Sequence, residues 1–138
     1  MNKTGTTILV VDDEPIALEF CRSALTRAGF SVLTAANAEQ ALRWFQSGDS
    51  SIELALLDIV MPGMSGAALA KRIVELCPET RIVLMSGYAP EDVKRIVGNE
   101  AASYRSMWKP FEAETLVRMI RNVLGEQSSA DRAKSKTT

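Results

Sequence analysis

The stretch Leu54-Ala55-Leu56-Leu57-Asp58 places one carboxylate directly after a run of apolar residues. A near-continuous apolar run is typical of a strand whose two faces are both covered, as in a parallel sheet with helices on either side. The carboxyl end of such a strand is where open α/β folds bind their ligands. The stretch therefore predicts a buried strand that presents Asp58 at a functional edge of the sheet.

The same arrangement recurs at the ends of three further apolar runs. The polar residues that follow or close these runs are Asp12, Asp13, Ser86 and Lys109. If all the runs are parallel strands, their carboxyl ends meet at one edge of the sheet, and we expect these four residues to gather around Asp58. Carboxylates, a lysine and a hydroxyl in one place form a site for a divalent cation and a phosphoryl group.

Longer amphipathic segments separate the apolar runs, and this alternation is the pattern of βαβ units. Strands are expected at about residues 7–12, 30–35, 52–57, 81–85 and 101–108, and helices at about residues 14–28, 38–46, 66–76, 90–98 and 111–124. Ile16, Phe20, Ala24 and Ala28 share one face of the first helix, which we expect to be buried. Right-handed crossovers then give an α/β fold with a doubly wound, five-stranded parallel sheet.

We expect one domain over residues 1–125. Residues 126–138 are rich in Ser, Ala and Lys and have no apolar period, so they are expected to be a disordered tail or a truncated linker.

The composition argues against several classes of protein. The chain has 138 residues and a formal net charge of -1, so nothing indicates a nucleic-acid surface. No apolar run reaches the roughly 20 residues of a membrane helix, and the two cysteines suggest no disulfide framework, so we expect a cytoplasmic protein. The chain has no histidine, which excludes a His-based catalytic triad and a role as a histidine phosphodonor.

Each polar residue taken alone has a structural explanation. An isolated Asp13 caps a helix, Ser86 before Gly87 is a turn residue, and Lys109 is a surface residue that flanks a helix. Taken together they favour chemistry, with Asp58 as a nucleophile that attacks a phosphoryl group and forms an acyl phosphate.

Four stretches together resemble the receiver domain of two-component response regulators. They are VVDDEP at residues 10–15, LDIVMPGMSG at 57–66, LMSGYA at 84–89 and KPF at 109–111. Each is a weak signal alone, but all four in this order and spacing are specific, and the resemblance covers about residues 7–124. It implies a flavodoxin-like fold with strand order 2-1-3-4-5.

The resemblance also implies a metal site. Asp13, Asp58 and the backbone carbonyl of Val60 would bind Mg²⁺ or Mn²⁺ directly, and Asp12 would act through a water molecule. Asp58 would be the phospho-acceptor and would take its phosphoryl group from the phosphohistidine of a histidine kinase or a histidine phosphotransfer protein.

Ser86 and Lys109 would hold the phosphoryl oxygens, and the Lys109–Pro110 bond would be cis. The function implied is a switch rather than an enzyme, with only self-phosphotransfer and self-dephosphorylation. Phosphorylation would change the surface formed by the fourth strand to the last helix, which a downstream effector protein would recognise.

The sequence departs from the family at Ser106, where an aromatic switch residue usually stands three positions before the lysine. Strand alternation puts Tyr104, Ser106 and Trp108 on one face, opposite Lys109. Either Tyr104 or Trp108 replaces the switch residue, or the usual coupling between the serine, here Ser86, and an aromatic residue is altered. Plain packing against the last helix explains both aromatics at least as well.

A further inference concerns the lifetime of the phosphorylated form. Val60 and Tyr88 occupy the variable positions two residues after Asp58 and Ser86. Neither side chain is a good orienter of an attacking water, so we predict slow self-dephosphorylation.

Other functions remain as alternatives. A flavodoxin-like cofactor binder would need a phosphate-cradling loop after the first strand, where this chain has acids that repel phosphate. A small-molecule aspartyl phosphatase usually has a D-x-D motif after the first strand and a cap, and neither is evident. A phosphorylation-independent pseudo-receiver is disfavoured by the complete acidic set. The motif at residues 85–88 resembles receivers of hybrid sensor kinases. A phosphorelay domain excised from such a kinase and a free-standing receiver therefore both stay open.

Overall fold

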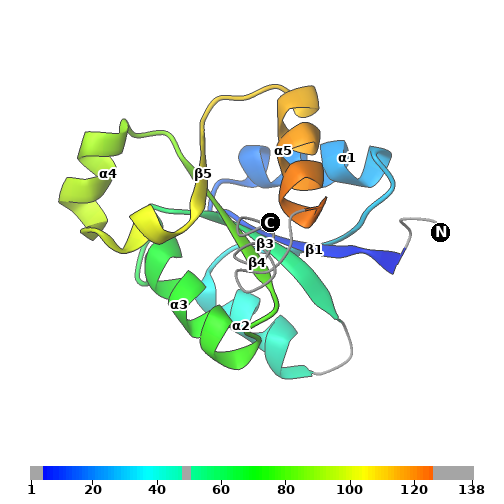
Figure 1. The fold of residues 1–138 in the computed structure, drawn as a ribbon, viewed down its shortest axis with the longest axis horizontal. Coiled ribbons are helices and arrows are strands. Elements are labelled where there is room, and N and C mark those ends of the chain that lie inside the picture. The colour runs from blue at the N-terminus through cyan, green and yellow to red at the C-terminus, as the bar shows by residue number, and fades with distance from the viewer. Residues whose placement is uncertain (1–4, 48–50, 126–138) are drawn as a thin grey trace, which may run out of the picture.

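Strands and helices alternate along the chain in the computed structural model, which describes residues 5–47 and 51–125 (Figure 1). The strands are β1 (Thr7–Val11), β2 (Ser31–Ala35), β3 (Ile52–Asp58), β4 (Arg81–Ser86) and β5 (Arg105–Trp108). The α-helices are α1 (Pro15–Arg27), α2 (Ala38–Ser47), α3 (Gly66–Leu76), α4 (Pro90–Val97) and α5 (Ala113–Gly125). The tail predicted at residues 126–138 lies outside the described residues.

The strands form one parallel sheet in the order β2-β1-β3-β4-β5. This confirms the predicted doubly wound α/β fold and its strand order. β3 is the central strand, and its residues from Leu54 to Leu57 are fully buried. Their burial explains the continuous apolar run, because a strand covered on both faces has no side exposed to water.

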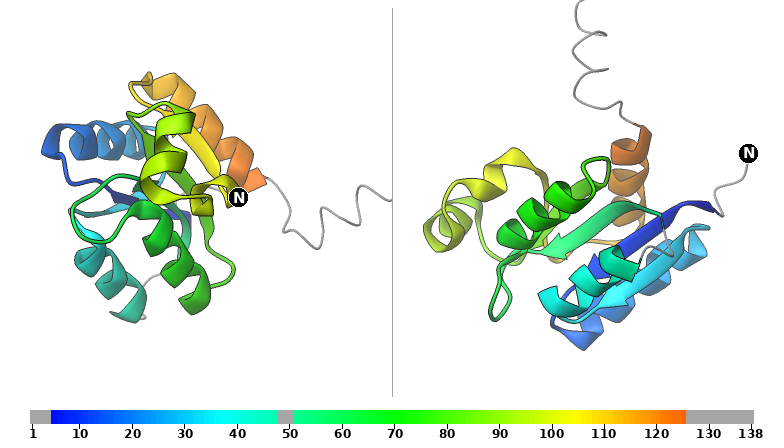
Figure 2. Two further views of the ribbon diagram at one scale, coloured as in Figure 1. Left: turned by 90° about the vertical axis from the view of Figure 1, so that its left-hand side faces the viewer. Right: turned by 90° about the horizontal axis from the view of Figure 1, so that it is seen from below.

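Helices cover both faces of the sheet: α1 and α5 lie on one face, and α2 and α3 on the other (Figures 1 and 2). Successive residues of β3 point to opposite faces. Leu54 and Leu56 pack in the hydrophobic cluster of α1 and α5, whereas Ala55 and Leu57 pack in the cluster that includes α2 and α3. Two hydrophobic layers therefore hold the central strand, and with it Asp58, in place.

The segment before β5 differs from the prediction. A strand was expected over residues 101–108, but Glu100–Ser103 forms a short 3₁₀ helix, η2, and only Arg105–Trp108 is strand. The backbone N–H of Tyr104 donates to the carbonyl of Ala101 at 3.2 Å, which closes the turn. Ala101 in this turn is buried against the core, so the turn has the apolar residue that a buried strand would have, and the sequence pattern does not separate the two.

The inner face predicted for α1 is partly wrong. Ile16 is 87% exposed and Phe20 is 40% exposed, whereas the buried residues of the helix are Cys21, Ala24 and Leu25. Ile16 lies in the first turn, where α1 faces the loop after β5 instead of the sheet. The apolar spacing along the helix does not distinguish these two environments.

Candidate functional site

The ends of four parallel strands bring the predicted polar residues to one edge of the sheet. Asp58 is the last residue of β3 and Ser86 the last of β4, while Asp12 directly follows β1 and Lys109 directly follows β5. The structure places three acids and the lysine within reach of one another, and it places Ser86 at the same edge with different hydrogen-bond partners.

The acids form a compact cluster. Each of Asp12, Asp13 and Asp58 offers a carboxylate oxygen, and these oxygens lie within 4.8 Å of one another. Asp12 and Asp58 are buried and Asp13 is exposed. A hydrogen bond fixes the carboxylate of Asp12, because its Oδ1 accepts the backbone N–H of Glu14 at 3.0 Å. Oxygen ligands from few carboxylates, with one side open to water, suit a hard cation such as Mg²⁺.

Lys109 supplies the positive charge of the cluster. Its Nζ donates to Asp12 Oδ2 at 2.9 Å and lies 3.5 Å from Asp58 Oδ1. Burial disfavours the charged amine, but the hydrogen bond to Asp12 and the negative charges of Asp58, Asp12 and Glu14 outweigh it and raise the pKa of Lys109. The lysine is therefore held as a cation beside the central carboxylate.

The carboxyl group of Asp58 has a strongly raised pKa. Burial is the largest cause, and the charge of Asp12 adds to it, so the pKa of Asp58 rises from 3.8 to about 7. The charge of Lys109 lowers this pKa, and that of Asp13 raises it further. One lysine does not offset three neighbouring acids, so the site is short of positive charge near neutral pH.

Ser86 is buried, but its hydroxyl is engaged in its own turn. Oγ accepts the backbone N–H of Tyr88 at 2.9 Å and donates to the carbonyl of Tyr88 at 3.2 Å. The carbonyl of Ser86 accepts the backbone N–H of Lys109 at 2.7 Å. Ser86 thus connects the loop after β4 to the loop after β5 without bonding to the acids.

Gly66 is a site residue that the sequence analysis did not single out. Its N–H donates to the carbonyl of Ile59 at 2.7 Å, which folds the β3–α3 loop back onto the end of β3. A Cβ at this position would lie 2.8 Å from the carbonyl carbon of Asp58 and 2.9 Å from Cα of Ile59. Val60 lies inside the loop that this contact closes. The glycine in the motif over residues 57–66 was the available signal.

Comparison with known proteins decides the family. Residues 8–121 match the family described as the response regulator receiver domain. The chain belongs to the response regulator receiver domain family.

Individual receiver-containing proteins are similar over most of this chain. The transcriptional regulatory protein AruR of Pseudomonas aeruginosa is 36% identical over 134 residues, which are 92% of this chain and 54% of AruR. The autoinducer 1 sensor kinase/phosphatase LuxN of Vibrio harveyi is 30% identical over 135 residues, or 98% of this chain and 15% of LuxN. The chain therefore spans about half of the first relative and a much smaller part of the second.

A solved receiver structure is similar in both fold and sequence. The response regulator TrrA of Thermotoga maritima, crystallised in complex with Mg²⁺ and BeF, superposes with a TM-score of 0.72 and is 33% identical, covering 86% of this chain and 98% of that chain. The strand order of this receiver domain and its acidic cluster agree with that likeness.

Two aromatic residues were candidates for the switch position of the receiver. Tyr104 is partly buried against the cluster that includes α2 and α3, and burial raises its pKa. Trp108 is 60% exposed. Ser106, between them, is exposed and lines a cavity beside β4. The Lys109–Pro110 bond is cis, as the resemblance implied.

Among the described residues of the receiver, no helix is both long enough and apolar enough to cross a membrane.

Proposed function

We propose that this receiver domain is a phosphorylation-controlled switch in which Asp58 accepts a phosphoryl group from the phosphohistidine of a histidine kinase or a histidine phosphotransfer protein. A carboxylate oxygen of Asp58 forms a bond to phosphorus while the bond from phosphorus to the imidazole nitrogen breaks, and the released imidazole takes up a proton from solvent. The observation that carries the proposal is the buried carboxylate at the end of β3, with Lys109 Nζ 3.5 Å from its oxygen.

The proposed cofactor is Mg²⁺, or Mn²⁺ in its place. Three carboxylate oxygens lie within 4.8 Å of one another beside a single lysine, which leaves a donor set with net negative charge that fits a divalent cation. Asp13, Asp58 and the backbone carbonyl of Val60 would hold the ion directly, and Asp12 would hold it through water. When bound, the cation offsets the negative charge that the acids present to an incoming phosphoryl group.

Lys109 and Ser86 are proposed to bind the phosphoryl oxygens. Lys109 already lies beside Asp58 and can pair with an added oxygen as a point charge. Ser86 must first give up the hydrogen bond that it donates to the carbonyl of Tyr88. The site therefore couples phosphorylation to a local rearrangement, which fits a switch that changes the surface from β4 to α5.

An exposed apolar patch beside the site supports docking of the phosphodonor protein. Ile16 and Phe20 of α1 face Pro110 and Phe111 across a cavity of about 590 Å³, and the rings of Phe20 and Phe111 lie 6.2 Å apart. The same cavity is lined by Lys109. A protein that binds here would bring its phosphohistidine next to Asp58.

The docking role is tested by Ile16→Ser, with Ile96→Ser on α4 as the control, because Ile96 is also an exposed isoleucine on a helix and lies outside this patch. With a phosphorylated histidine kinase that labels the wild-type chain, Ile16→Ser should slow transfer about tenfold, equivalent to about 1.4 kcal/mol. Labelling by acetyl phosphate should not change. Equal transfer rates in the two variants would refute the assignment of this patch.

We also propose that the protein is cytoplasmic. Residues 1–125 would be the receiver domain, and residues 126–138 would be a tail or linker. Hydrolysis of the acyl phosphate would return the switch to its resting state. A separate effector protein, or another domain of a longer chain, would provide the output.

Intact mass after incubation with acetyl phosphate and Mg²⁺ tests the proposed function. The wild-type chain should gain the mass of one PO₃ group, and Asp58→Asn should gain none. A wild-type chain that gains no such mass from acetyl phosphate or any phosphohistidine donor would instead be a phosphorylation-independent interaction module. An equal gain in Asp58→Asn would place the acceptor elsewhere.

A further inference from the structure

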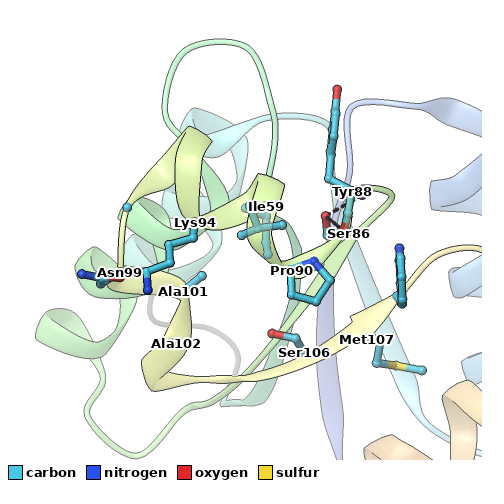
Figure 3. Close-up of a pocket in the computed structure, with 13 residues that line it drawn as sticks. Ile59, Ser86, Tyr88, Pro90, Lys94, Asn99, Ala101, Ala102, Ser106 and Met107 are labelled. Atoms are coloured by element: carbon cyan, nitrogen blue, oxygen red, sulfur yellow. Dashed lines mark hydrogen bonds between the residues drawn. The ribbon is translucent and has the colours of Figure 1, made fainter.

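A cavity lies beside Ser86, between β4, α4, η2 and β5 (Figure 3). Its volume is about 350 Å³, and most of its lining is apolar, including Ile59, Val93, Ala101 and Ala102. A dry, apolar cavity of roughly 150 Å³ is enough to bind benzene. The space beside Ser106 therefore has room for an aromatic side chain, and Ser106 itself is too small to fill it.

Three aromatic side chains are close enough in sequence to be considered as occupants. Tyr104 does not line the cavity and is packed on the cluster that includes α2 and α3. Trp108 lines the cavity, and its backbone is held by pairing with Ser86 in the sheet. Tyr88 also lines the cavity and belongs to the loop after β4.

Tyr88 has an exposed ring, and one side chain at the end of β4 bonds to both of its backbone polar groups. The residue is 47% exposed, and its ring points away from Ser106 and Ala101 (Figure 3). Both the N–H and the carbonyl of Tyr88 are bonded to Ser86 Oγ. A Cβ at the preceding Gly87 would meet nothing within 4 Å, so the backbone there has open space around it.

These contacts connect the state of Asp58 to the position of the Tyr88 ring. A hydroxyl has one proton to donate, so Ser86 cannot donate at once to a phosphoryl oxygen and to the carbonyl of Tyr88. When Ser86 turns to the phosphoryl group, the loop after β4 loses the hydrogen bond that Ser86 donates to the carbonyl of Tyr88. The exposed apolar surface of the ring then favours burial in the adjacent cavity.

We infer that the Tyr88 ring enters the cavity beside Ser106 when Asp58 is phosphorylated, so that a loop residue takes the place of an aromatic residue on β5. This inference rests on the proposed function. It makes Tyr88 a positioning residue that fixes the active arrangement of the loop after β4, and it assigns neither Tyr104 nor Trp108 this role.

Nuclear Overhauser contacts in the full chain test the inference. The chain has two tyrosines, so Tyr104→Phe leaves Tyr88 as the sole source of tyrosine ring signals. In this background, Mg²⁺ with beryllofluoride should produce new contacts between the Tyr88 ring and the methyl groups of Ala101 and Ala102. The contacts should be absent without beryllofluoride.

Two substitutions at one position provide the matched control. Ser106→Phe fills the cavity and should abolish the new contacts, whereas Ser106→Ala leaves the cavity open and should retain them. Both variants should still gain the mass of PO₃ from acetyl phosphate, which shows that they are folded and accept the phosphoryl group. Repeating the measurement with wild-type Tyr104 checks that its substitution is harmless.

The outcomes separate the inference from the proposed function. A chain that gains PO₃ but shows no contact from Tyr88 to Ala101 or Ala102 overturns the inference and leaves the phospho-acceptor role intact. Contacts from the indole of Trp108 in their place also overturn it. A chain that gains no PO₃ from any donor overturns the proposed function and, with it, the inference.

Discussion

Replacement of Asp58 by Asn should stabilise the metal-free protein, and the gain should increase with pH. The folded state raises the pKa of Asp58 from 3.8 to about 7, mainly through burial and the charge of Asp12. Between these two values the folded state binds more protons at this group than the unfolded state. Stability contributed by the group therefore falls as pH rises from about 4 to about 7, and the loss is complete above the folded-state pKa.

The size of the effect follows from the two pKa values. Their difference, at about 1.4 kcal/mol per pH unit, corresponds to about 4 kcal/mol over the whole range. Part of this falls below pH 5, and salt screens some of the remainder. Between pH 5 and pH 8, Asp58→Asn should therefore gain about 2 kcal/mol of unfolding free energy relative to wild type.

Urea unfolding in EDTA at pH 5 and pH 8 measures this gain as a difference between the two proteins. Subtracting wild type from variant removes the titration of the other carboxyl groups. Glu75→Gln, an exposed acid on α3, is the control and should show no pH-dependent gain. Mg²⁺ at pH 8 should reduce the difference in unfolding free energy between the variant and wild type, because a cation that binds only the folded wild-type site stabilises the wild-type protein. If the gain in unfolding free energy of Asp58→Asn is no larger at pH 8 than at pH 5, the folded state does not raise the pKa of Asp58 and the reasoning is wrong.

The remaining predictions concern neighbouring residues. Lys109→Ala should reduce the rate of PO₃ gain from acetyl phosphate at least tenfold, because the phosphoryl oxygens lose their cation; an unchanged rate in a mass time course would contradict its role. Gly66→Ala should destabilise the fold by about 3 kcal/mol in urea unfolding, because its Cβ would meet the backbone at the end of β3, whereas Gly87→Ala, with open space around it, should cost less than about 1 kcal/mol. The double variant Val60→Asn, Tyr88→Glu should lose the phosphorylated form faster than wild type, because polar side chains can orient an attacking water. If intact mass shows the same rate of decay in both proteins, these positions do not set the lifetime.

Much of the fold and the site could be predicted from local patterns. Alternating apolar runs and amphipathic segments specify strands and helices in turn, and the rule of right-handed crossovers then leaves few topologies. An acid such as Asp58 after a fully apolar run is informative because such a strand ends where ligands bind. Patterns failed where a segment packs in an unusual place: Ile16 follows helical spacing but faces a loop, and Ala101 is buried in a 3₁₀ turn.

The sequence by itself determined the parallel sheet and the set of polar residues at its edge, since both depend on periodicities of a few residues. Only the tertiary structure decided how those residues interact. Lys109 and Asp12 are 97 positions apart and form a 2.9 Å ion pair, and Ser86 is bonded to its own turn instead of to the acids. The cavity beside Ser106 likewise arises from four elements meeting around one small side chain. Contacts between distant segments depend on how the helices and strands pack, and no local periodicity records that packing.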